Sequence, residues 1–170
     1  MLRRFTRHAG GAAAVEFAFI APIMLILYFG MTEATQALLA NRRAGAVTTA
    51  VGDLVAQSAQ ISAADVDSIF DASTAIMKPF PTGNLAIRVT SIQIDENKVI
   101  TKKWTRPRGT IAETSLSDID PKLKVANTSI LRAETIYTLN TPFNQILPKS
   151  FVFKHRMDLR PRSGAAIPLL

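Results

Sequence analysis

The most apolar stretch of the chain lies close to its N-terminus. Residues 12–31 contain a single charged side chain, Glu16. About 20 helical residues, at roughly 1.5 Å each, cross a bilayer core of about 30 Å. Arg3, Arg4 and Arg7 precede this stretch, and basic residues beside a membrane helix mark its cytoplasmic side. The pattern predicts a single-pass inner-membrane protein with a cytoplasmic N-terminus and a periplasmic or extracellular C-terminal part.

A secretory signal and a buried soluble helix are the other interpretations of this stretch. The apolar region of a secretory signal is shorter, about 7–15 residues, and closes with small residues. Here the apolar run is longer and opens with small residues, at positions 12–14. The order of residue sizes therefore favours a membrane anchor.

Small and apolar residues continue at helical spacing beyond the membrane stretch. They lie at Ala34, Ala37, Ala40, Ala44, Val47, Val51, Leu54 and Val55. This spacing places them on one helix face. We expect residues 32–60 to form a helical stalk, bent or interrupted near Gly45 or Gly52. Packing on the protein's own domain and packing between subunits both fit this face.

From residue 61 onward the pattern of apolar residues predicts one more helix and then several strands. Ser62 and Asp65 have the spacing of a capping box, and Pro79 and Pro81 end the helix that follows. Residues 105–126 are expected to form a long loop. Alternating apolar residues predict four strands, at residues 85–94 with a phase change near Ser91 as at a bulge, and at 99–105, 130–139 and 151–159. Helices followed by antiparallel strands indicate an α+β fold.

Charge and composition narrow the function classes. The 170 residues carry 20 basic and 13 acidic side chains, a net charge of +7, and no cysteine. The lack of cysteine excludes disulfides, thiolate metal sites and a cysteine nucleophile. A basic chain often binds nucleic acid, and residues 102–108 mix basic side chains with Trp104. Because we expect this segment outside the cytoplasm, we predict no nucleic-acid partner.

A short motif spans the junction between the basic leader and the membrane stretch. Residues 10–17 read GGAAAVEF, with Gly11 and Ala12 followed by Glu16 and Phe17. This motif resembles the cleavage site of type IV-like prepilins of the Flp/Tad (tight adherence) class. The resemblance implies that a membrane prepilin peptidase cuts between Gly11 and Ala12. It also implies that Glu16, as the fifth mature residue, sets subunit register by pairing with the new amine of a neighbour.

A wider segment, residues 10–51, is similar to the TadE-like pseudopilins of this pilus system. The residues that carry the similarity are Ala14, Val15, Glu16, Phe17, Ala18, Ala21, Pro22, Gly30 and residues 41–44. The resemblance implies a minor pseudopilin with a pilin-like antiparallel sheet and, as partners, the membrane, the peptidase, other pilins and Tad assembly proteins. Pro22 removes a backbone hydrogen bond and is expected to kink the helix.

Four regions follow from these observations. The resemblance implies that residues 1–11 form a basic prepilin-type leader, and we expect residues 12–31 to form the transmembrane helix, 32–60 the helical stalk and 61–170 the extracytoplasmic α+β domain. The alternative is an uncleaved single-pass membrane anchor that displays a periplasmic ligand-binding or sensory domain.

Catalytic and metal-binding motifs are not found in the sequence. The two histidines are His8, in the leader, and His155, which we expect to be a hydrogen-bonded, partly buried strand residue. Residues 95–96 and the pair Asp118 and Asp120 are expected in turns that their own side chains stabilise. No P-loop, dinucleotide fingerprint or nucleophile elbow occurs. We therefore expect no enzyme activity, cofactor, metal or small-molecule substrate.

Overall fold

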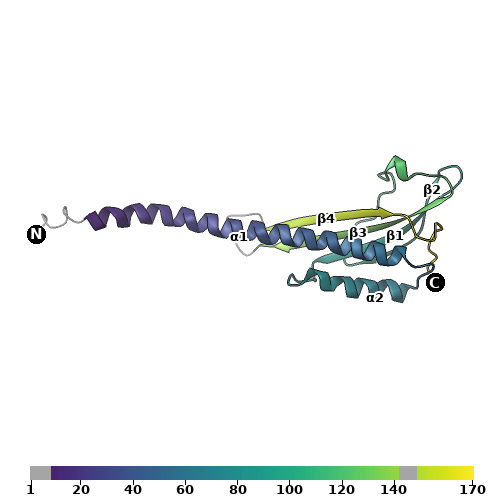
Figure 1. Ribbon diagram of the computed structural model, residues 1–170, viewed down its shortest axis with the longest axis horizontal. Coiled ribbons are helices and arrows are strands. Elements are labelled where there is room, and N and C mark those ends of the chain that lie inside the picture. The colour runs from purple at the N-terminus through teal and green to yellow at the C-terminus, as the bar shows by residue number, and fades with distance from the viewer. Residues whose placement is uncertain (1–8, 142–148) are drawn as a thin grey trace, which may run out of the picture.

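The computed structural model describes residues 9–141 and 149–170. The leader residues Arg3, Arg4, Arg7 and His8 lie outside the described residues. One long helix extends from a domain in which helices cover a sheet (Figure 1). The elements are α1 (Ala9–Ala56), α2 (Ala63–Thr74), η2 (Ala75–Met77), β1 (Leu85–Ile94), β2 (Ile100–Arg108), η3 (Pro121–Leu123), β3 (Thr128–Asn140) and β4 (Ser150–Leu159).

Helix α1 is continuous over 48 residues, or about 72 Å at 1.5 Å per residue. The predicted interruption near Gly45 or Gly52 is wrong. Both glycines face β4: a β-carbon added to Gly45 would lie 3.3 Å from the ring of His155, and one added to Gly52 would lie 2.6 Å from Cδ1 of Leu159. The glycines therefore let the helix approach the sheet closely. Pro22 lies inside α1, and the kink expected there stays a prediction.

The sheet confirms the predicted α+β class. Its four strands are antiparallel in the order β2-β1-β3-β4. Strand β4 alternates between exposed and half-buried residues over most of its length, as its sequence predicts. Strand β2 runs on to Arg108, so the expectation that residues 106–108 belong to the loop is wrong. Because β2 is an edge strand, Pro107 is tolerated there despite its missing N–H group.

The predicted phase change in β1 has two separate causes. The β1–β2 register shifts between Ser91 and Ile92, because Ser91 pairs with Trp104 and Ile92 with Lys102. The extra residue, Lys103, therefore belongs to β2, and the β1–β3 register is unbroken. The apolar residues change phase because the last two isoleucines of β1 belong to a second cluster on the other face of the sheet. That cluster consists of Ile92, Ile94, Ile119 and Ile130.

The main core lies between the helices and one face of the sheet. The part of α1 that packs there contributes mostly small side chains, namely Ala37, Ala40, Ala44, Val47, Val51, Val55 and Ala56. Helix α2 lies beside α1 (Figure 1) and contributes Val66 and Phe70. Its predicted capping box is present, with Ser62 and Asp65 hydrogen-bonded reciprocally. Six of the eight residues on the apolar face of the predicted stalk therefore pack on the protein's own domain, whereas Ala34 and Leu54 are exposed.

Candidate membrane and assembly site

The first half of α1 projects from the domain (Figure 1). Large apolar side chains are exposed on all of its sides. These side chains are each 37–74% exposed and are Val15, Phe17, Phe19, Ile20, Ile23, Met24, Leu25, Ile26, Leu27, Tyr28, Phe29 and Met31. Among the described residues, α1 is the one helix that is long and apolar enough to cross a membrane.

Contiguous apolar surface of this extent marks a binding or membrane-contacting region in a protein. A helix that is apolar all round is stable where its surroundings are apolar as well. Residues 12–31 match the thickness of a bilayer core, and within the described part of the chain the most apolar window of α1 is not covered. The structure is therefore consistent with single-pass membrane anchoring by α1.

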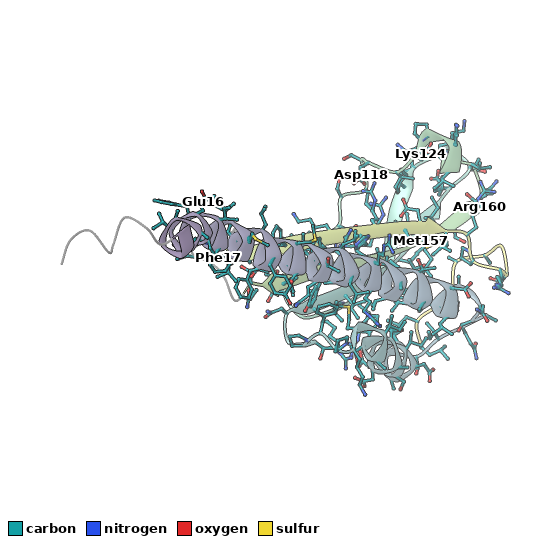
Figure 2. All side chains as sticks on the ribbon, turned by 60° about the vertical axis from the view of Figure 1, so that its left-hand side comes forward. Glu16, Phe17, Asp118, Lys124, Met157 and Arg160 are labelled. Atoms are coloured by element: carbon teal, nitrogen blue, oxygen red, sulfur yellow. The ribbon has the colours of Figure 1, made fainter. Side chains whose placement is uncertain are left out.

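Glu16 and Phe17 lie near the free end of α1, and both side chains are exposed (Figure 2). The helix begins at Ala9, and its first turn contains no acidic residue. Glu16 is therefore beyond the turn over which the helix dipole acts on a charge.

Gly11 and Ala12 occupy the start of the same helix. A β-carbon added to Gly11 would meet no atom within 4 Å, so no packing among the described residues requires a glycine there. Glycine costs a helix about 1 kcal/mol relative to alanine. The glycine therefore weakens the first turns of α1 without improving any contact described within the chain.

A network of charged side chains on the sheet face opposite the helices was missed by the sequence analysis. Nη2 of Arg88 lies 2.6 Å from Oε2 of Glu134. Arg132, whose side chain is fully buried, donates from Nε and Nη2 to Asp158 at 2.7 and 2.8 Å. Nη1 of Arg132 also donates to Asp118 at 2.8 Å. The sequence did contain one indication of this network. Arg132 and Glu134 are two residues apart in an apolar strand, so they lie on the same face of the sheet.

The environment of this network shifts two pKa values. Burial alone lowers the pKa of Arg132, but hydrogen bonds to Asp158 and Asp118 outweigh it and raise that pKa above its ordinary value. The hydrogen bond from Arg132 holds the pKa of Asp118 below its usual range, and Arg156 adds to this effect. Arg132 also donates to the backbone oxygen of Ser115. The network thus ties the loop after β2 to the sheet.

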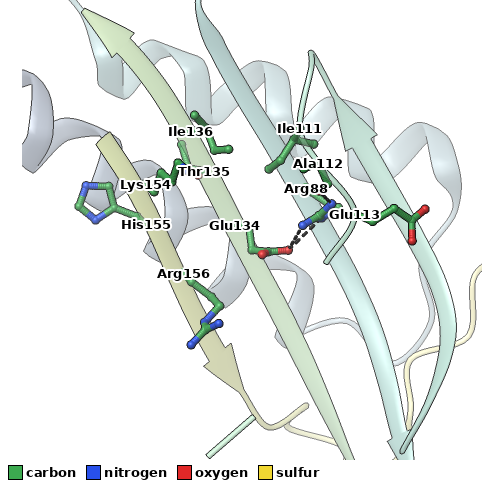
Figure 3. A pocket seen from close by; sticks show the side chains of 10 residues that line it. All are labelled: Arg88, Ile111, Ala112, Glu113, Glu134, Thr135, Ile136, Lys154, His155 and Arg156. Atoms are coloured by element: carbon green, nitrogen blue, oxygen red, sulfur yellow. Dashed lines mark hydrogen bonds and ion pairs between the residues drawn. The ribbon is translucent and has the colours of Figure 1, made fainter. Parts of the chain in front are cut away.

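A cavity of about 260 Å³ opens beside the network (Figure 3). Arg88 and Glu134 line it and bind each other, and Arg88 also donates to the backbone oxygen of Ala112. Lys154 and Arg156 come from β4 on the other side of the cavity. An anionic ligand would have to compete with Glu134 and the backbone oxygen of Ala112 for the guanidinium group of Arg88. The geometry therefore favours a structural role for this pair.

The remaining polar residues singled out in the sequence have structural partners. Asp120 accepts a hydrogen bond from the backbone of Lys122 at 2.8 Å, which confirms the predicted turn. Asp118 lies in a turn, as predicted, but its side chain binds Arg132 and Arg156, so the prediction that this side chain stabilises the turn is wrong. Nε2 of His155 lies 2.8 Å from Oδ1 of Asn41, as expected for a hydrogen-bonded, partly buried histidine.

Most of the basic side chains in residues 102–108 are paired within the chain. Arg106 contacts Asp67 at 2.5 Å, Arg108 contacts Asp71 at 2.7 Å and Lys102 contacts Glu113 at 3.4 Å. The indole N–H of Trp104 donates to the backbone oxygen of Ile167 at 2.7 Å. The segment fastens α2, the following loop and the C-terminal residues to the edge of the sheet.

Comparison with known proteins identifies the long helix rather than the sheet domain. No curated protein and no solved structure matches the chain. The model of one family, described as TadE-like protein, matches residues 11–52. The matched residues include the exposed half of α1 and most of the half that packs on the sheet. Over residues 11–52, about a quarter of its length, the chain is therefore similar to the TadE-like protein family.

Proposed function

We propose that the protein is a minor pseudopilin-like structural protein, without enzyme activity, that takes part in assembling a Tad/Flp-type adhesive pilus. The main support for the proposal is that the family match lies on α1, including its projecting half. The match begins at Gly11, the residue before the proposed cut. It continues along the exposed apolar surface and ends in the part of α1 that packs on the sheet.

The proposed topology places the N-terminus in the cytoplasm and the sheet domain in the periplasm or outside the cell. Three arginines lie before residue 12, whereas residues 32–41 contain no basic residue. This asymmetry supports the orientation, because basic residues remain on the cytoplasmic side of a membrane helix.

Processing is proposed to occur between Gly11 and Ala12. The bond lies near the start of α1, where backbone N–H groups have no partner within the helix and the end frays most easily. The free space around Gly11 leaves the bond accessible to a membrane peptidase. Cleavage would make Ala12 the first residue and would give it a free ammonium group.

Assembly is proposed to depend on the pairing of Glu16 with that ammonium group on a neighbouring subunit. A carboxylate within an apolar membrane helix is costly and requires a partner. An ammonium ion at hydrogen-bond distance supplies both the opposite charge and donors. The remaining apolar side chains of residues 12–31 would pack against other pilins and Tad assembly proteins.

The mass of the N-terminal peptide from the membrane fraction tests the processing step. We expect the mature chain to begin at Ala12. Gly11→Val should block the cut, whereas Gly30→Val should not, although both glycines lie in open space on the same helix. An intact leader on the wild-type chain would contradict the proposal and favour the uncleaved anchor with a ligand-binding or sensory domain.

The assembly role of Glu16 requires a separate experiment. Glu16→Ala should insert into the membrane normally but should lose pilus-dependent adhesion. Gln36→Ala, which changes another exposed polar residue of α1, serves as the control and should leave adhesion unchanged. Normal piliation by Glu16→Ala would show that the carboxylate does not set register.

A further inference from the structure

One end of the sheet domain reaches the level at which the predicted membrane segment ends. Strand β4 runs alongside α1, with His155 against Gly45 and Leu159 against Gly52. From His155 back to Ser150 the strand covers about 16 Å at 3.3 Å per residue. The same length corresponds to about 11 helical residues. Strand β4 therefore begins opposite about residue 34 of α1, close to Glu33, which is 4% exposed.

The connection between η2 and β1 lies at the same end of the domain. Helix α2 runs back along α1, and Nη1 of Arg43 donates to the backbone oxygen of Ile76 at 2.8 Å. Leu85 pairs with Tyr137, which in turn pairs with Phe153 near the start of β4. In Figure 1 both the α2–β1 connection and the start of β4 face the projecting half of α1. We call residues 78–84 and 149–150 the domain base.

The domain base lies within reach of lipid headgroups if residues 12–31 span the bilayer. Its connection begins two residues after Ile76, which Arg43 binds, so it starts roughly 18 Å beyond residue 31 and extends from there toward the projecting half of α1 (Figure 1). The headgroup layer extends about 5–8 Å from the hydrocarbon core on each side. Lysine side chains span most of the remaining gap, because their long stems let the ammonium group reach toward the interface.

The charges at this end are suited to an anionic surface. Lys78 and Lys149 are exposed, and among the described residues neither forms an ion pair, unlike Arg88 and Arg106. Residues 77–85 and 149–154 contain no acidic residue. Glu33 is the nearest carboxylate on the facing part of α1, and it is buried.

We infer that the domain base docks on anionic phospholipid headgroups through Lys78 and Lys149. The inference rests on the proposed insertion of residues 12–31 and adds a second contact with the same membrane. Each lysine ammonium group donates hydrogen bonds to lipid phosphate oxygens and is attracted by the negative surface. The contact holds the sheet domain against the bilayer, and a subunit that leaves the membrane during assembly must break it.

Full-length protein in lipid nanodiscs provides the test. The chain contains no cysteine, so a fluorophore on Thr82→Cys reports on the domain base alone, and a quencher on the lipid headgroups measures its distance from the membrane. We expect strong quenching in nanodiscs with phosphatidylglycerol and weak quenching with phosphatidylcholine only. Raising the salt concentration from 0.05 to 0.5 M should weaken quenching, because it screens exposed charges.

Two double variants with the same change in net charge test whether Lys78 and Lys149 are the residues that bind the headgroups. Each lysine near an anionic surface favours docking about fivefold, so Lys78→Glu with Lys149→Glu should lower the docked-to-free ratio at least about 25-fold. Lys103→Glu with Lys122→Glu changes the net charge equally but lies away from the domain base, and it should leave quenching unchanged.

The outcomes separate this inference from the proposed membrane insertion. Equal quenching with the two lipids, or equal effects of the two double variants, would overturn headgroup docking while leaving insertion intact. Failure of the wild-type chain to enter nanodiscs would overturn both.

Discussion

The two halves of α1 are both apolar and both helical, but they differ in what covers them. Before residue 33 the large side chains are exposed on every side, whereas from residue 37 one face packs on the sheet. The covered half uses alanine, glycine and valine on its packed face, and the uncovered half uses phenylalanine, isoleucine, leucine and methionine.

Side-chain size therefore distinguishes the half of α1 that packs on the sheet from the half that projects. A helix that packs closely on a sheet needs small side chains at the contact, and Gly45 and Gly52 bring its backbone against β4. A helix surrounded by lipid has no such restriction and gains from large apolar surface. Pairs of matched substitutions, one in each half of α1, test this difference by their effects on the stability of the domain.

The largest expected effect comes from enlarging a glycine in the covered half. Gly52→Leu would collide with Leu159 and Ala133 and should destabilise the domain by about 3 kcal/mol. Gly30→Leu, in open space, should leave domain stability unchanged. Thermal unfolding of the detergent-solubilised chain, followed through the single Trp104, measures both. Equal melting temperatures would show that the helix–sheet contact is not tight.

The second-largest effect on stability is expected from shortening a buried valine of α1 to alanine. Val51→Ala leaves a cavity in a fully buried site and should cost about 2 kcal/mol. Val15→Ala alters a side chain that is 57% exposed and should not change unfolding of the domain. A similar loss in both variants would contradict the division of α1 into two environments.

A smaller effect is expected from the polar contact between α1 and β4. Asn41→Ala removes the partner of His155 and should cost about 1 kcal/mol, the usual contribution of one hydrogen bond. Gln36→Ala, outside the packed face, is the matched change and should have no effect. Chemical denaturation of the two variants checks the difference.

Acid should weaken the domain and leave the uncovered half of α1 helical. Hydrogen bonds from Arg106 and Arg132 hold the pKa values of Asp67 and Asp118 below the ordinary value, which is about 4. Each aspartate therefore stabilises the fold above that value, and the contribution is lost as the pH falls through the lowered pKa. Near-ultraviolet circular dichroism should change in this acid range while far-ultraviolet helical signal persists in micelles. Asp67→Asn should reduce the dependence on pH.

Features that depend on neighbours in the sequence could be predicted from it. The capping box at Ser62 and the alternation of β4 follow from spacings of three and two residues, and both are present. The apolar helix follows from composition over about 20 positions. These patterns need no knowledge of which element packs on which.

Features that depend on tertiary contacts could not be predicted. Gly45 and Gly52 resembled helix breaks, because the sequence does not show that β4 lies against them. The ion pair of Asp118 was missed, because its partner Arg132 is 14 positions away and lies on β3. For Gly11, Ala12, Glu16 and Phe17, the roles depend on a peptidase and a neighbouring subunit, so they stay proposals.

The unbroken course of α1 has a rotational consequence. Each helical residue advances the direction of its side chain by about 100°, and α1 contacts both β3 and β4 directly. The direction in which Glu16 points is therefore fixed relative to the sheet by the number of residues between them. Turning the membrane half about its axis turns the domain through the same angle. Inserting one residue after Thr32 would rotate Glu16 relative to the sheet by about 100° without changing the sequence of either half of α1.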